Sequence, residues 1–106
     1  MDIEKELHLF LYLLSKEDYY QAHDEMEHLW REMKKEDHKL TNFIKGLINA
    51  AVAFEHIKRA TPNASIKAQK TFAGFAKYKN DCKYLTDELK AVCFAVEQKA
   101  KHMNLL

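Results

Sequence analysis

Glycine and proline are scarce in this chain of 106 residues, which contains only 2 glycines and 1 proline. Both residues punctuate turns and break helices, so their scarcity argues against a strand-and-turn protein and favours long helices. Hydrophobic residues make up 47% of the chain and charged residues 31%, which predicts a folded chain rather than a disordered one. We expect a single domain over residues 1–106, because this length is typical of one domain.

An excess of charge of one sign is also missing, since 17 basic and 16 acidic residues give a net charge of +1. Without a basic excess we expect no nucleic-acid partner, and we interpret the lysines between Lys67 and Lys83 as a solvated face. The longest apolar run, residues 9–14, is too short to span a bilayer, so no membrane partner is expected either.

Cysteine is limited to Cys82 and Cys93. Both fall within one predicted helix, so we expect that they cannot form a disulfide with each other. Reduced thiols, together with a mixed-charge start that lacks the plan of a signal peptide, predict a cytoplasmic protein.

The spacing of apolar residues predicts about five antiparallel helices in a compact all-α bundle. The expected ranges are residues 3–14, 18–33, 38–59 and 64–79, and a last helix that begins at Asp81. A capping box of Asp18 and Gln21 starts the second helix, and the segment 61–63 ends the third. Gly46, inside the third helix, is expected to mark a close helix crossing under Trp30.

The second helix carries polar residues on the face where core is expected. At about 100° per residue, His23 and Glu27 fall on the same inward face as Trp30, whereas Glu25 and His28 fall on the far side and should be solvated. An inward carboxylate is costly unless it finds a partner. Since His23 lies one turn before Glu27, the two side chains can touch.

Two interpretations of the His23–Glu27 pair stay open. The pair can be a buried hydrogen bond that locks the helix into the bundle, or it can be two metal ligands or a base with its orienting partner. Tyr19 shares the inward face. Asn49 and His56 share a polar stripe of the third helix, and an antiparallel packing would bring one of them to the level of the pair.

Two segments of the sequence also point to a known family. Residues 23–30 fit the pattern HxxxExxW, and residues 46–56, Gly-Leu-Ile-Asn-Ala-Ala-Val-Ala-Phe-Glu-His, follow further along. Together they resemble the bacterial and archaeal family called domain of unknown function 309, over about residues 4–78.

The resemblance implies a compact helical fold and a site at His23, Glu27 and Trp30 for which metal binding has been proposed. It implies no activity. The sequence departs from the family at Ala60-Thr61-Pro62-Asn63, where a Gly-Asn turn is usual, and at Asn49, where glutamine is frequent.

Three functions remain open at this point. The first is a structural or interaction module that has a second copy or another protein as its partner. The second is a metal site in which His23, Glu27 and His56 bind a divalent metal such as zinc. The third is a metal-dependent, hydrolase-like enzyme, in which the metal keeps an open position for water.

Overall fold

The computed structural model describes residues 2–106 of the chain and forms an all-α bundle of five helices. The helices are α1 Ile3–Ser15, α2 Tyr19–Lys35, α3 Thr41–Arg59, α4 Ala64–Asp81 and α5 Asp87–His102. The all-α fold class is therefore confirmed. Met1, which belongs to the expected domain of residues 1–106, lies outside the described residues.

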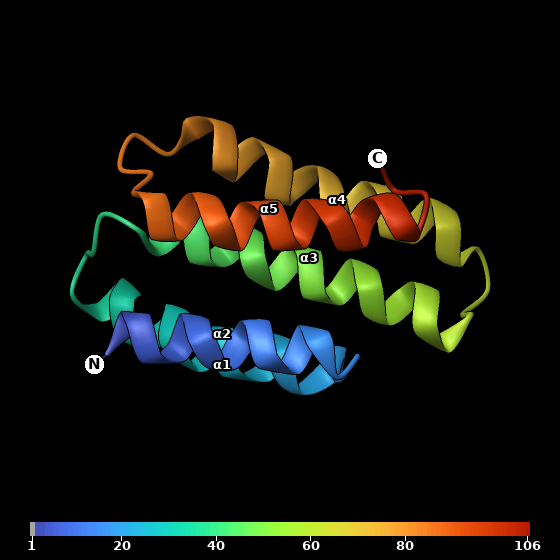
Figure 1. Ribbon diagram of the computed structural model, residues 1–106, viewed down its shortest axis with the longest axis horizontal. Coiled ribbons are helices and arrows are strands. Elements are labelled where there is room, and N and C mark those ends of the chain that lie inside the picture. The colour runs from blue at the N-terminus through green and yellow to red at the C-terminus, as the bar shows by residue number, and fades with distance from the viewer. Residues whose placement is uncertain (1) are drawn as a thin grey trace.

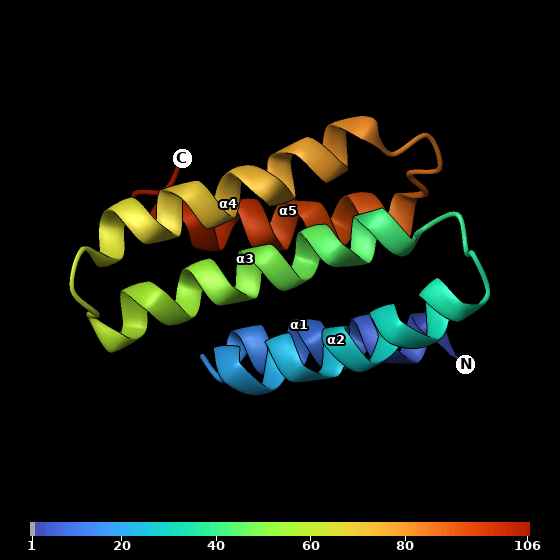
Figure 2. The same ribbon diagram turned by 180° about the vertical axis from the view of Figure 1, so that it is seen from behind.

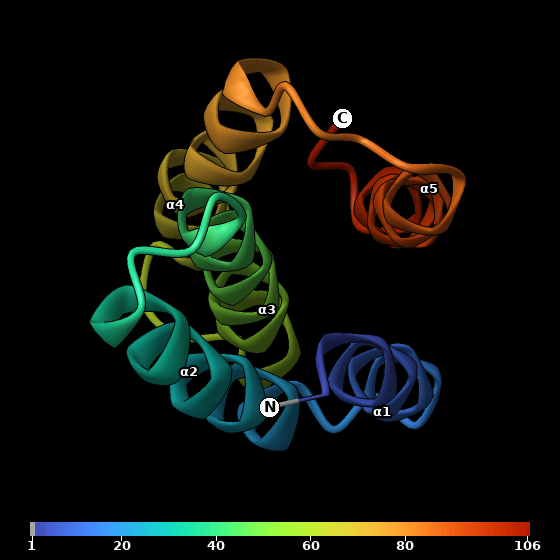
Figure 3. The same ribbon diagram turned by 90° about the vertical axis from the view of Figure 1, so that its left-hand side faces the viewer.

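Helix α3 lies in the middle of the bundle. Viewed end-on, α1 and α2 lie on one side of it, and α4 and α5 lie on the other (Figure 3). Successive helices run back and forth along the long axis of a molecule that measures 37 × 24 × 23 Å (Figure 1). Helices α2, α3 and α4 together form one face, which is turned towards the viewer in Figure 2.

None of the helices in residues 2–106 combines the length and the hydrophobicity that crossing a membrane requires.

The core is apolar because α3 is apolar on most of its circumference. Every fully buried side chain of residues 2–106 is hydrophobic. Phe54 of α3 connects three helices, since its ring lies 5.5 Å from the ring of Tyr19 in α2 and 5.9 Å from the ring of Phe72 in α4. These aromatic contacts fix how α2 and α4 sit on α3.

Helix α4 crosses α3 closely, and two glycines mark the crossing. A Cβ atom on Gly46 would lie 3.1 Å from Tyr78 Cβ and 3.5 Å from Phe75 Cα, so α4 passes over this glycine. The expectation that Gly46 lies under Trp30 was therefore wrong, because the close neighbour is α4 and not α2. Gly74 of α4 likewise lies where a Cβ atom would meet α3, at the side chain of Asn49.

Two helices begin later than expected, because local hydrogen bonds define their starts. His38 Nδ1 accepts the backbone N–H of Leu40, and the Thr41 hydroxyl donates to the carbonyl of His38, so α3 begins at Thr41 and not at residue 38. Thr86 Oγ1 accepts the N–H of Leu89 and caps α5, which therefore begins at Asp87. Asp81, the expected start of the last helix, is the last residue of α4.

The two cysteines do not share a helix, so that expectation was also wrong. Cys82 follows the last residue of α4, whereas Cys93 lies in the middle of α5. Both thiols are free. Cys93 is buried, and this burial raises the pKa of its thiol to about 11, whereas Cys82 is partly exposed.

Candidate functional site

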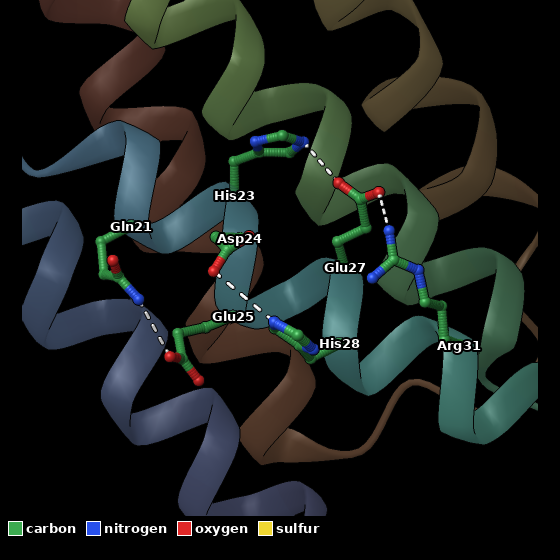
Figure 4. A network of polar contacts seen from close by, with 7 residues as sticks. All are labelled: Gln21, His23, Asp24, Glu25, Glu27, His28 and Arg31. Atoms are coloured by element: carbon green, nitrogen blue, oxygen red, sulfur yellow. Dashed lines mark hydrogen bonds and ion pairs between the residues drawn. The ribbon is translucent and has the colours of Figure 1, made fainter.

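A polar row consisting of His23, Glu27 and Arg31 follows α2 on the side that faces α3. Its members are spaced one turn apart, so they share one side of the helix. The Asp18 carboxylate accepts the N–H of Gln21 at 3.2 Å and starts the helix, and the burial of Tyr19 against α3 sets its rotation. Figure 4 shows the three side chains in line.

The carboxylate of Glu27 is engaged at both oxygens. His23 Nε2 lies 2.9 Å from Glu27 Oε2, and Arg31 Nη2 donates to Glu27 Oε1 at 2.7 Å. The Arg31 contact is a hydrogen bond, whereas the His23 contact is a close approach in which the ring N–H is not aimed along the line to Oε2. Because a carboxylate only accepts hydrogen bonds, this closeness favours a proton on His23 Nε2. The other ring nitrogen, Nδ1, points away from Glu27 (Figure 4) and would be the acceptor of a neutral imidazole whose proton is on Nε2.

The polar row lies at the edge of the core rather than inside it. The side chains of His23 and Glu27 are 29% and 31% exposed, and that of Arg31 is 55% exposed. The inward face predicted for His23 and Glu27 is thus half-buried, because water reaches the boundary between α2 and α3.

A hollow of about 220 Å³ lies between the start of α2 and the end of α3. Tyr20 and His23 line it from α2, Val52 and His56 line it from α3, and Thr61 lines it from the turn that follows. The hollow therefore brings His56 to the level of His23, as an antiparallel packing of the two helices predicts.

The rim of the hollow carries unused hydrogen-bonding capacity. Thr61 Oγ1 is shielded from solvent and has no hydrogen-bond partner among residues 2–106. Arg59 donates through Nε to Glu55, and both side chains line the hollow. An orphaned hydroxyl in a partly apolar hollow is the kind of group that a bound ligand would satisfy.

Trp30 lies outside this hollow. It is partly buried, with the ammonium groups of Lys34 and Lys45 at 4.8 and 4.7 Å from its ring centroid. Lys34 belongs to α2 and Lys45 to α3, so the indole ring joins the two helices through cation–π contacts. The structure assigns Trp30 to packing between α2 and α3 and not to the walls of the hollow.

Tyr19 is a core residue. It is only 1% exposed, and its hydroxyl has no hydrogen-bond partner in the described part of the chain. Burial, followed by the charges of Glu17 and Glu55, raises its pKa to about 12. Tyr19 does not line the hollow.

Asn49 faces α4. A Cβ atom built on Gly74 would overlap Asn49 Nδ2, so the amide covers that glycine. The amide therefore packs between α3 and α4, away from the hollow, and the structure does not bring it together with His23 and His56.

The opposite side of α2 was expected to be solvated, and this holds for only one of the two residues. The His28 side chain is 64% exposed. Glu25 is partly buried and accepts a hydrogen bond from Gln21 Nε2 at 3.0 Å on the side of α2 that faces α1 (Figure 4). The difference arises because α1 covers this side of α2.

The expected metal ligands are not assembled around one point. The ligand atoms of His23, Glu27 and His56 do not all lie within 4.8 Å of one another in the region that the structure describes. Both carboxylate oxygens of Glu27 are also already in contact with other side chains, one with His23 and one with Arg31. The arrangement therefore fits an oriented imidazole better than a three-ligand centre.

The sequence interpretation missed Arg31 and Thr61. Arg31 follows Glu27 by one helical turn, and that spacing alone could have identified it as a partner. Thr61 had no such signal, because its place in the hollow depends on how the turn after α3 folds back towards α2.

Of the comparisons with known proteins, the one with protein families found a match. A family model described as domain of unknown function (DUF309) matches residues 7–67, which is more than half of the chain and includes His23, Glu27 and His56. No curated protein and no solved structure matches this chain. The chain thus belongs to the domain of unknown function 309 family.

Proposed function

We propose that this protein is a helical binding module that holds a small ligand in the hollow between α2 and α3. The observation that carries the proposal is the polar row, in which Glu27 Oε2 lies 2.9 Å from His23 Nε2 and the other ring nitrogen of His23 points away from the carboxylate (Figure 4). A carboxylate that fixes the tautomer and direction of an imidazole prepares it to accept a hydrogen bond or to take up a proton.

Stability alone is a weak explanation for the polar row. Ion pairs with this much exposure contribute about 0.2–1 kcal/mol, because water screens them and the side chains lose freedom. Replacing Glu27 by glutamine should therefore cost the fold little. An arrangement that adds so little stability is better explained by what it does to His23.

The walls of the hollow indicate the class of ligand. Tyr20 and Val52 offer apolar surface, His23 Nδ1 offers an acceptor, and Thr61 and Arg59 offer donors. At about 220 Å³ the hollow is smaller than most ligand pockets, which measure about 300–1,000 Å³, so it admits only a compound as small as a single ring. We therefore expect a small aromatic molecule that carries both donor and acceptor groups.

A library of single-ring aromatic fragments, screened by ligand-observed NMR, tests the proposal. The expected result is a set of fragments that bind the wild type and lose at least about tenfold in affinity in His23→Ala and Thr61→Val. His28→Ala serves as the control, because His28 lies on the other side of α2 and pairs with Asp24 one turn before it, at a longer distance of 3.6 Å.

The proposal fails if no fragment binds, or if the bound fragments are insensitive to His23→Ala and Thr61→Val. It also fails if His28→Ala weakens binding as much as His23→Ala does. Circular dichroism of each variant shows whether the fold is intact, so that a loss of binding is not confused with unfolding.

A metal ion is the second candidate ligand, and one observation favours it. Histidines that bind metals usually donate their other N–H to a carboxylate, and His23 Nε2 lies 2.9 Å from the Glu27 carboxylate. His23 Nδ1 and His56 would be the protein ligands, with Glu27 as a supporting group. Zn²⁺ binding that disappears in both His23→Ala and His56→Ala would support this candidate, and binding unchanged in both would reject it.

A further inference from the structure

A second cluster of donor side chains lies far from the hollow, between α1 and α5. Glu4 and His8 stand one turn apart on α1, and Glu88 lies in the first turn of α5. Their ligand atoms all lie within 4.8 Å of one another, and this is the one such group of three in the described residues. The sequence interpretation did not single out any of these residues.

The geometry points to a divalent-metal site formed by Glu4, His8 and Glu88, and we propose that it takes Zn²⁺. Two carboxylates and one imidazole are a mixed oxygen and nitrogen donor set, which suits zinc with a water molecule as the fourth ligand. Zinc binds such ligands at about 2.0–2.2 Å, so the donor atoms of a tetrahedral site lie about 3.4 Å apart.

The observed distances are close to that requirement. His8 Nε2 already lies 3.6 Å from Glu88 Oε1. The side chains of His8 and Glu88 are 65% and 40% exposed, so small rotations can bring the three donors onto one ion without disturbing the core.

One oxygen of the Glu88 carboxylate lacks a hydrogen-bond partner among the described residues. Its Oε1 atom is shielded from solvent yet has no hydrogen-bond partner in residues 2–106. The contact of 3.6 Å with His8 is too long for a hydrogen bond. A shielded carboxylate oxygen without a partner is unfavourable, and a cation at this point would satisfy it.

The charge around the cluster supports the same conclusion. Glu4 and Glu88 have no lysine or arginine within 4.0 Å in the described chain. Two carboxylates held close together without a counter-charge repel each other. A divalent cation would relieve this repulsion and tie α1 to α5.

Calorimetric titration of the untagged protein with Zn²⁺ tests the site. We use a Cys82→Ser background, because Cys82 is partly exposed and its thiol is itself a zinc ligand. The expected result is binding that weakens at least tenfold in His8→Ala and in Glu88→Gln. Zn²⁺ should also raise the Tm of the parent protein but not that of His8→Ala.

Two variants serve as matched controls for this site. His28→Ala removes an equally exposed histidine that has a carboxylate at the same distance of 3.6 Å but no third ligand. His23→Ala removes the histidine of the hollow. Neither should change the binding that depends on His8, and His23→Ala separates this site from the metal candidate in the hollow.

The proposal is overturned if Zn²⁺ does not bind, or if His8→Ala and Glu88→Gln bind it as tightly as the parent. It is also overturned if His28→Ala loses affinity to the same extent. None of these results bears on the fragments expected in the hollow, so the two proposals fail independently.

Discussion

Tyr19 has a buried hydroxyl that has no partner, and this gives the first prediction. A buried polar group without a hydrogen-bond partner lowers the free energy of unfolding by about 1–3 kcal/mol, and removing the group recovers part of this loss. Tyr19→Phe keeps the ring contacts with Phe54 and removes only the hydroxyl. We expect the free energy of unfolding in urea to rise by up to about 1 kcal/mol.

Tyr20→Phe is the control for this change, because Tyr20 is 59% exposed and its hydroxyl can reach water. It should change stability by less than about 0.5 kcal/mol. A clear loss of stability in Tyr19→Phe would mean that the hydroxyl has a partner, and the prediction would be wrong.

At the scale of single residues, the sequence predicted proximity along a helix better than it predicted contacts between helices. The pairing of His23 with Glu27 followed from their spacing, since side chains one turn apart meet on any helix. The direction in which Asn49 faces did not follow, because its position on the helix was compatible with facing α2 or α4. Only the packing of Gly74 decides between them.

The end of α3 gives a prediction at the scale of elements. Ala60 adopts a left-handed conformation with φ of 51°, which favours glycine because a Cβ atom crowds the following carbonyl. Ala60→Gly should therefore stabilise the protein by about 0.5–1 kcal/mol, as measured by thermal or urea unfolding. Ala64→Gly, in the first turn of α4, is the control and should not stabilise. Equal effects of the two changes would show that the conformation of Ala60 is not the cause.

The crossing of α3 and α4 gives a second prediction at this scale. Gly74→Ala should destabilise the wild type, because the new Cβ atom would overlap the amide of Asn49. In the Asn49→Ala background the overlap disappears, and the higher helix propensity of alanine should add up to about 1 kcal/mol of stability. A double-mutant cycle measured in urea checks this change of sign, and additive effects would contradict it.

The helices themselves were easier to predict than their starts. Apolar periodicity identified all five, since each buries one continuous face. The starts of α3 and α5 depend on local hydrogen bonds of His38 and Thr86, which compete with the helical pattern. That competition also explains why Cys82 was placed in the wrong element.

At the scale of the whole molecule, the protein should lose stability in alkaline solution. Burial raises the pKa of Tyr19 from 10.0 to about 12 and that of Cys93 from 9.0 to about 11. The pKa of Lys79 is also raised, first through its hydrogen bond to Glu97. The folded state holds these protons more tightly than the unfolded state does. Their contribution to the free energy of unfolding is therefore complete below about pH 9 and is lost as the pH rises through 11–12.

Urea unfolding followed from about pH 8 to pH 11 measures this loss, which we expect to reach about 2–4 kcal/mol. Tyr19→Phe should show a shallower decline, because one of the three groups is gone. A stability profile that stays flat up to pH 11 would contradict the assignment.

The arrangement of the bundle also explains which sites the sequence could indicate. His23, Glu27 and the candidate ligand pair Glu4 and His8 are each local to one helix, so their spacing is visible in the sequence. Thr61 and Glu88 complete the two sites from other parts of the chain. Their positions depend on how α2 meets the turn after α3 and how α1 meets α5.

The orientation of His23 by Glu27 is best tested by ¹H–¹⁵N correlation spectra of the histidine side chains near neutral pH. We expect neutral His23 to carry its proton on Nε2 and to leave Nδ1 unprotonated, and we expect Glu27→Ala to abolish this preference. A proton on Nδ1, or a spectrum of His23 that does not respond to Glu27→Ala, would contradict the proposed site.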